Sequence, residues 1–134
     1  VFARPFVNSG RLSTAVHYPR SRLNTADTQV WQGGIAPGAP ALDAPLGGQW
    51  LLGRLGRGFV LLANGWTGAV PEGVELIDIT RLPAGSQLVV DRYQLQPGSS
   101  YLIRPDHYVA ARWQQQPSSD QIRASIAAAQ GALQ

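Results

Sequence analysis

The sequence predicts an α/β domain in which a mixed sheet ends in a β-hairpin and a C-terminal helix. Three observations predict this class. The unbroken apolar run at 59–63 is typical of a strand covered on both faces. Residues 101–113 form two strand-like arms around a Pro-Asp-His turn. Residues 117–133 carry an apolar stripe at helical spacing.

The composition indicates one globular domain. The 134 residues are 44% hydrophobic and 14% charged, which is typical of a chain that buries a core. Cysteine is absent, so disulfides, thiol catalysis and cysteine-bound zinc are excluded. No apolar run approaches the roughly 18 residues that a membrane helix needs. We therefore expect no membrane partner.

The positive charge does not indicate a nucleic-acid partner. The net charge is +3, and all 11 basic residues are arginine. They are scattered along the chain, whereas a nucleic-acid surface gathers basic and aromatic side chains on one face. Methionine is also absent, even at position 1. We expect a processed product or, preferably, a piece of a longer chain, because nothing near Val1 resembles a signal peptide.

Residues 1–49 are predicted to form an irregular N-terminal arm or linker, because prolines and glycines interrupt every pattern there. A strand at 1–7 is possible, although Pro5 breaks it. Trp31, Ile35 and Leu42 are large and apolar, so we expect them to be buried against another surface.

Residues 50–134 are predicted to form the folded domain. A short helix is expected at 49–57, with Trp50, Leu51 and Leu55 on one side and Gly58 after it. Strands are then expected at 59–63, 74–79 and 87–93. The first two of these strands are separated by a loop at 64–68.

The hairpin has arms at 101–104 and 108–113. Pro105 fixes φ for the second position of a type I turn, and Asp106 suits the third. His107 should then adopt positive φ in a three-residue loop with a bulge, at a cost of about 1–2 kcal/mol.

The C-terminal helix has a start signal and an apolar stripe. Ser118 and Gln121 have the spacing of a capping box. The stripe recurs every three or four residues and consists of Ile122, Ile126, Ala129 and Leu133.

This order of elements resembles the second half of a thioredoxin-like domain. A redox thioredoxin would place a helix led by Cys-x-x-Cys at 64–73, where this chain has ten glycine-rich and polar residues and no cysteine. We therefore expect a thioredoxin-like domain that lacks the CxxC motif, with that helix shortened or lost.

The hairpin also carries a resemblance to a family. Residues 102–112, Leu-Ile-Arg-Pro-Asp-His-Tyr-Val-Ala-Ala-Arg, are similar to the Leu-Val-Arg-Pro-Asp-Gly-Tyr-Val-Ala-Trp-Arg motif near the end of FAD-dependent aromatic-ring hydroxylases. These are flavin monooxygenases of the phenol hydroxylase and 3-(3-hydroxyphenyl)propionate hydroxylase type. Weaker similarities at 18–23, 37–46 and 58–62 occur in the family's order, and the resemblance covers about residues 10–128. His107 and Ala111 depart from it, where the family has Gly and Trp.

The resemblance implies the C-terminal thioredoxin-like domain of such an enzyme, a domain associated with structural packing and dimerisation. The family's flavin-binding motifs lie outside this region, so no catalytic, cofactor-binding or metal residue is predicted here. The larger enzyme would be a cytoplasmic aromatic monooxygenase using FAD and NAD(P)H. Its partners would be the catalytic domains of the same chain and a second copy in a homodimer. The alternative is a stand-alone, cysteine-free thioredoxin-like binding or scaffold module.

Several residues have both a chemical and a structural interpretation. The glycine-rich segment 53–58 precedes a strand, whereas a phosphate loop follows one, so we expect a turn. Arg104 and Asp106 could bind a substrate or partner. The structural alternative is that Asp106 bonds its own turn while Arg104 pairs with Asp91 or Asp78.

The remaining candidates are histidines and tryptophans. Neither His17 nor His107 has the sequence spacing of a metal site or a hydrolase. We expect His17 to be a surface or interface residue and His107 to be a turn residue. A metal site would have to draw on the carboxylates Asp27, Asp43, Glu72, Glu75, Asp78, Asp91, Asp106 and Asp120. An aromatic ligand pocket would draw on Trp31, Trp50, Trp66 and Trp113, which more often fill cores and interfaces. We expect Trp66, in its glycine-rich loop, to be exposed as a partner contact.

Overall fold

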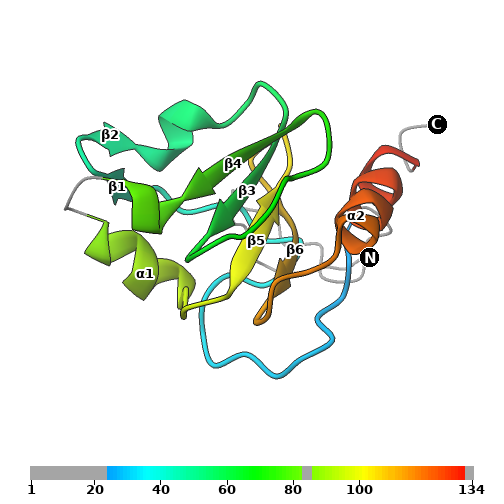
Figure 1. Cartoon of the computed structure of the whole chain (residues 1–134), viewed down its shortest axis with the longest axis horizontal. Coiled ribbons are helices and arrows are strands. Elements are labelled where there is room, and N and C mark those ends of the chain that lie inside the picture. Colours follow the sequence, from blue (N-terminus) through cyan, green and yellow to red (C-terminus); the bar gives the residue numbers. More distant parts are fainter. Residues whose placement is uncertain (1–23, 83–85, 132–134) are drawn as a thin grey trace, which may run out of the picture.

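A four-stranded mixed sheet forms the centre of the molecule (Figure 1). The computed structural model describes residues 24–82 and 86–131. The strand order is β4-β3-β5-β6, and the strands are β3 (Phe59–Ala63), β4 (Val74–Asp78), β5 (Ser100–Ile103) and β6 (Val109–Trp113). β3 pairs in parallel with β4 and antiparallel with β5, which pairs antiparallel with β6. The predicted α/β class with a mixed sheet is confirmed, and the topology is consistent with a small thioredoxin-like domain.

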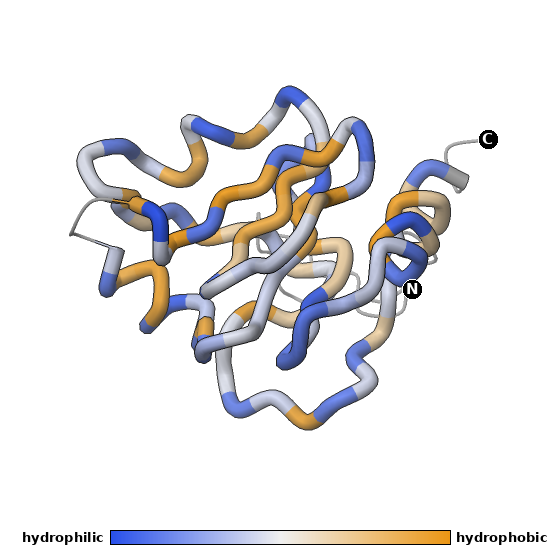
Figure 2. Tube along the Cα trace, viewed as in Figure 1, coloured by the Kyte–Doolittle hydropathy of each residue, from blue (hydrophilic) through white to orange (hydrophobic). Residues whose placement is uncertain are grey.

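Each face of the sheet has its own apolar core. Leu62, Ile77 and Tyr101 belong to the cluster that includes the arm and helix α1 (Gln87–Tyr93). Leu61 and Leu102, on the opposite face, pack with the residues of helix α2 (Ser119–Gly131). Figure 2 shows the hydrophobic residues concentrated along the central strands. This two-sided burial explains the unbroken apolar run of β3.

The segment 87–93 is an α-helix, so the predicted strand there is wrong. Valine and tyrosine favour strands, but Val89 and Tyr93 lie four residues apart and are both fully buried on one helical face. The helix ends at Gln94, which takes a left-handed conformation with φ of 49°. Tertiary packing of two side chains therefore outweighs local strand propensity.

The described part of the loop between β3 and β4, residues 64–73, contains no helix, as predicted from its glycine and polar content. The predicted helix at 49–57 is wrong. Two-residue strands β1 (Pro45–Leu46) and β2 (Gln49–Trp50) form a small hairpin, followed by a single 3₁₀ turn, η1 (Leu51–Arg54). Of the residues placed on one side of that helix, Leu51 and Leu55 are buried, whereas Trp50 is 59% exposed. Glycines 53, 56 and 58 are poor helix formers, which explains why the turn does not extend.

The described part of the arm, residues 24–49, lies against the edge of β6. The Gly38 N–H donates to the Val109 carbonyl (2.8 Å), and the Val109 N–H donates to the Ala39 carbonyl (2.9 Å). The Thr25 N–H donates to the Ala110 carbonyl (2.7 Å). These bonds satisfy an edge that would otherwise be open to pairing with another chain.

The predicted burial of the arm is correct for some of its residues. Ile35 is buried and Trp31 is half-buried, but Leu42 is 48% exposed, which corrects the expectation for that residue. The predicted strand at 1–7 and His17 lie outside the described residues.

The C-terminal helix α2 starts with the predicted capping box. The Gln121 N–H donates to Ser118 Oγ (3.1 Å), and the Ser118 N–H donates to Gln121 Oε1 (2.8 Å). Ile122 belongs to the core on this face of the sheet, with Ile126 packed against it, and Ala129 is also buried. Leu133 lies outside the described residues. None of the described helices is long and apolar enough to cross a membrane.

Candidate functional site

The Arg104–Tyr108 turn has the predicted local geometry. The His107 N–H donates to the Arg104 carbonyl (2.9 Å), and the Arg104 N–H donates to the Tyr108 carbonyl (2.8 Å). His107 has φ of 74°, as expected for a left-handed residue closing this loop. The β5–β6 pairing shifts register between Leu102 and Ile103, just before the turn.

The side chains of Arg104 and Asp106 stabilise this turn. The two side chains form an ion pair, and Asp106 Oδ1 accepts a hydrogen bond from the Tyr108 N–H (3.3 Å). The guanidinium of Arg104 also lies 5.8 Å from the centre of the Tyr108 ring. Asp106 therefore bonds its own turn, as expected.

The carboxylates predicted to pair with Arg104 have other partners. Asp78 pairs with Arg81 (3.6 Å), and Asp91 accepts a hydrogen bond from Gln87 (2.9 Å). Arg104 is close enough to Asp106 to pair within the turn, so the predicted partner of Arg104 is wrong.

The glycine-rich segment 53–58 leads from η1 into β3. Phosphate binding at a helix terminus requires glycines after a strand and a helix that begins directly behind them. In this segment the strand follows the glycines, so the geometry of a phosphate loop is not formed.

Trp66 occupies the loop where a redox thioredoxin carries its cysteines, and it is only 5% exposed. The expectation of an exposed Trp66 is therefore wrong. Asp78, at the end of β4, holds the loop in place: Oδ1 accepts from the Gly65 N–H and Oδ2 from the Trp66 N–H, each at 3.0 Å. Asp78 holds the backbone of the loop, and the Trp66 ring lies in the core between the sheet and α2, called the α2-side core below.

Asp78 is buried and retains its charge. Burial raises the pKa of its carboxyl group, but the hydrogen bonds from Thr80, Gly65 and Trp66 outweigh burial and hold the pKa below its ordinary value. The Thr80 hydroxyl donates to Oδ1 of Asp78 at 2.7 Å. All of these donors belong to the protein itself, so Asp78 stabilises a loop and has no proton to exchange near neutral pH.

Arg112 and Asp27 form a second buried polar cluster. The guanidinium donates to both carboxylate oxygens of Asp27, from Nη2 at 2.8 Å and from Nε at 3.0 and 3.1 Å. Nη1 donates to the Gly33 carbonyl (3.0 Å). Burial lowers the pKa of Arg112, but the bonds to Asp27 outweigh burial, so the pKa is raised and the side chain stays charged. The pair fastens the arm to β6.

Two tyrosines lie next to this cluster. The Tyr101 hydroxyl donates to the Tyr93 carbonyl (2.6 Å) and accepts from the Ile35 N–H (3.2 Å). The Tyr93 hydroxyl donates to the Leu42 carbonyl (2.6 Å). Burial raises the pKa of both phenols, so they remain neutral donors. Gly34, with φ of 73°, is required beside them, since a Cβ there would lie 2.4 Å from the Tyr101 oxygen.

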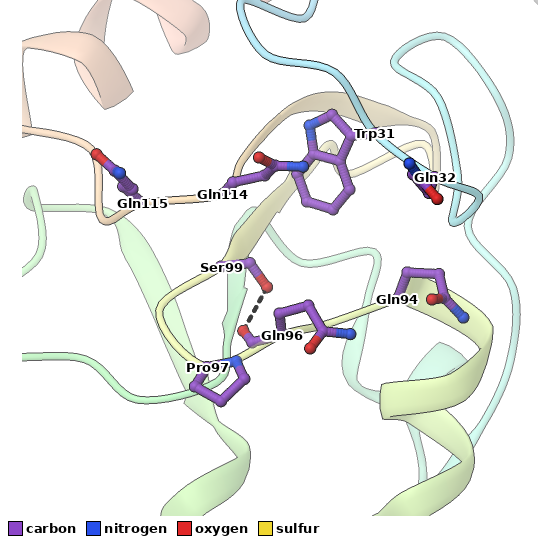
Figure 3. Close-up of a pocket in the computed structure, with 8 residues that line it drawn as sticks. All are labelled: Trp31, Gln32, Gln94, Gln96, Pro97, Ser99, Gln114 and Gln115. Carbon is purple, nitrogen blue, oxygen red and sulfur yellow. Dashed lines mark hydrogen bonds between the residues drawn. The ribbon is translucent and has the colours of Figure 1, made fainter.

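A cleft of about 490 Å³ opens beside this cluster (Figure 3). Three segments meet there: the arm, the connection from α1 to β5, and the residues after β6. Its lining contains five glutamines, one aromatic ring and no ionisable side chain, and consists of Trp31, Gln32, Gln94, Gln96, Pro97, Ser99, Gln114 and Gln115. In chemical terms the cleft can offer neutral hydrogen-bonding groups and an indole surface.

The structure does not bring the candidate metal ligands together. Within residues 24–82 and 86–131, no group of three or more histidine, cysteine, aspartate or glutamate side chains could hold a metal ion. The four tryptophans do not share one pocket either. Trp66 and Trp113 belong to the α2-side core, Trp31 lines the cleft, and Trp50 is exposed on β2.

Sequence reasoning missed the polar clusters and the cleft. Arg112 lies in a strand among apolar residues, a pattern that signals a buried ion pair, but its partner Asp27 is 85 residues away. The glutamines of the cleft are dispersed over three segments, and no spacing rule connects them.

The comparisons with known proteins identify structural neighbours. No protein-family model matches the chain, and no curated protein matches its sequence. The rebeccamycin biosynthetic enzyme RebC, solved with reduced flavin, is 27% identical, with a TM-score of 0.59 over 84% of this chain. Aklavinone-11 hydroxylase, solved with FAD and aklavinone, is 21% identical, with a TM-score of 0.64 over 86% of this chain, and shows the fold alone.

The chain spans only 22% of RebC and 26% of aklavinone-11 hydroxylase. The likeness is therefore to one segment of a larger protein, which agrees with the resemblance carried by the hairpin motif. The structural neighbours of this chain are FAD-dependent flavin monooxygenases, and its fold is consistent with that of a C-terminal domain of such enzymes.

Proposed function

We propose that this chain is the non-catalytic C-terminal domain of a larger, cytoplasmic aromatic monooxygenase that uses FAD and NAD(P)H. In that enzyme it packs on the catalytic domains and supports a homodimer. The observation that carries the proposal is the match of 84% of this chain to 22% of RebC at 27% identity. RebC was solved with reduced flavin and aklavinone-11 hydroxylase with FAD, which supports a flavin in the proposed enzyme, and we assign it to the domains outside this one.

The chemistry of the described residues supports a structural role. A catalytic acid or base needs access to a substrate and a pKa near the working pH. Among the residues that the structure describes, Asp78 and Arg112 are the buried charged ones, and the hydrogen bonds of both are made to this chain's own loop, arm and strands. Their pKa shifts move them further from neutrality.

The test compares three proteins: this chain alone, the full reading frame, and the full reading frame truncated before this domain. We expect FAD binding and phenol-dependent NADPH consumption only in the proteins that contain the sequence upstream of this domain. We expect the truncated protein to retain FAD but to lose stability and the dimer, measured by thermal unfolding and light scattering. FAD binding with phenol-dependent NADPH consumption by this chain alone would overturn the proposal.

A second candidate function is a stand-alone binding or scaffold module. It is favoured by the self-contained core and by the arm, which covers the β6 edge with its own backbone. The gene upstream of Val1 discriminates between the two functions. An upstream frame encoding Gly-x-Gly-x-x-Gly supports the enzyme domain, whereas a start codon beside Val1 supports the module.

A further inference from the structure

We infer that the glutamine-lined cleft is a binding site for a neutral, hydroxyl-rich small molecule, of which a monosaccharide or disaccharide is the simplest example. The inference concerns this chain alone and does not depend on the proposed function. The volume of about 490 Å³ lies within the roughly 300–1,000 Å³ of small-molecule pockets.

The cleft carries no charged side chain, which disfavours ionic ligands. None of its eight lining residues is ionisable. Arg112 lies next to the cleft, 4.4 Å from the centre of the Trp31 ring, but its guanidinium donates to Asp27, Gly33 and Tyr101. A phosphate or carboxylate would therefore lose its water without gaining a counter-charge, which is costly.

The amides supply what hydroxyl groups need. Each glutamine side chain offers an acceptor oxygen and two donor hydrogens, and a hydroxyl is both donor and acceptor. Gln94 and Gln114 are held by bonds from Nε2 to the carbonyls of Asp91 and Val30, which leaves their Oε1 atoms as acceptors. In the part of the chain that the structure describes, the side chains of Gln32, Gln96 and Gln115 form no hydrogen bond with protein.

Trp31 gives the cleft a fixed apolar wall. Its ring contacts Arg112 on one side and meets the Tyr101 ring edge to face, with centroids 5.5 Å apart. In Figure 3, Trp31 and Gln114 border one side of the cleft, and Gln96 and Pro97 face them from the other. Sugars present both hydroxyl groups and C–H faces, so amides beside a rigid indole match both of their surfaces.

The test is a titration of the full 134-residue chain, labelled with ¹⁵N, with glucose, galactose and maltose, and separately with glucose 6-phosphate. We expect at least one neutral sugar to shift amide and side-chain resonances of the lining residues, with millimolar affinity. We expect glucose 6-phosphate to bind more weakly than glucose. Gln96→Ala and Gln115→Ala should each weaken binding about three- to tenfold, the loss expected for one or two hydrogen bonds.

The matched control is Gln130→Ala, which removes an exposed glutamine from α2, outside the cleft. It should leave the sugar affinity unchanged. The proposal is overturned if none of the neutral sugars shifts the lining resonances, or if the shifts map to another surface. Equal or tighter binding of glucose 6-phosphate would also overturn it, because the cleft would then be selecting charge.

Discussion

The buried side chain of Asp78 fixes the backbone of the loop between β3 and β4. Where a redox thioredoxin would have a helix, this chain has a loop, and the Asp78 carboxylate accepts hydrogen bonds from the Gly65, Trp66 and Thr80 N–H groups. We predict that Asp78→Ala lowers the free energy of unfolding by about 2–4 kcal/mol, because these donors lose their partner. Urea unfolding measures the change. Glu72→Ala, at an exposed side chain that forms no hydrogen bond or ion pair with the described residues, should change it by less than about 0.5 kcal/mol.

The same residue predicts a pH dependence. The pKa of Asp78 is lower in the folded protein than the ordinary 3.8, so the unfolded chain takes up its proton first as the pH falls. The stabilisation by Asp78 is complete above about pH 5 and is lost as the pH falls through 3.8 towards the folded value. Asp78→Asn should flatten the acid limb of the unfolding free energy. An acid limb as steep as that of the wild type would show that other carboxylates account for it.

At the scale of elements, the parts governed by local chemistry were predictable. The hairpin turn depends on Pro105, Asp106 and His107, which are adjacent, and the capping box on residues three apart. Helix α1 was not predictable from its residues, because packing of Val89 and Tyr93 against the sheet overrides their strand preference. The burial of Trp66 depends on Asp78, 12 residues away, so its loop composition alone pointed to the wrong environment.

The hairpin supplies a prediction at this scale. His107 has φ of 74°, where a side chain costs about 1–2 kcal/mol, whereas glycine pays only the entropy of a freer unfolded chain. We predict that His107→Gly raises the free energy of unfolding by about 0.5–1 kcal/mol, measured by urea unfolding. Gln94→Gly relieves the same kind of backbone strain at the end of α1. It also removes the side-chain bond to the Asp91 carbonyl, so we expect a smaller gain in the free energy of unfolding than for His107→Gly. A loss of stability in His107→Gly would mean that the imidazole contacts outweigh the strain.

For the whole molecule, the Arg112–Asp27 pair decides whether the arm and the sheet act as one unit. Asp27→Ala would leave a guanidinium buried without its carboxylate, since only 7% of the Arg112 side chain is exposed. We predict a loss of about 2–4 kcal/mol in the free energy of unfolding, slightly less than for a fully buried pair, because Asp27 is partly exposed.

The double variant separates the ion pair from the packing of the arm. Arg112→Met keeps an apolar stem beneath Trp31 and removes the charge, so adding it to Asp27→Ala should restore part of the lost stability. Urea unfolding of the wild type, both single variants and the double variant completes the cycle, and hydrogen exchange at Gly38 and Val109 reports whether the arm detaches first. Strictly additive losses would show that the two residues do not interact. An unchanged exchange rate at Gly38 in Asp27→Ala would show that the other hydrogen bonds of the arm, among them its backbone bonds to β6, hold it without the ion pair.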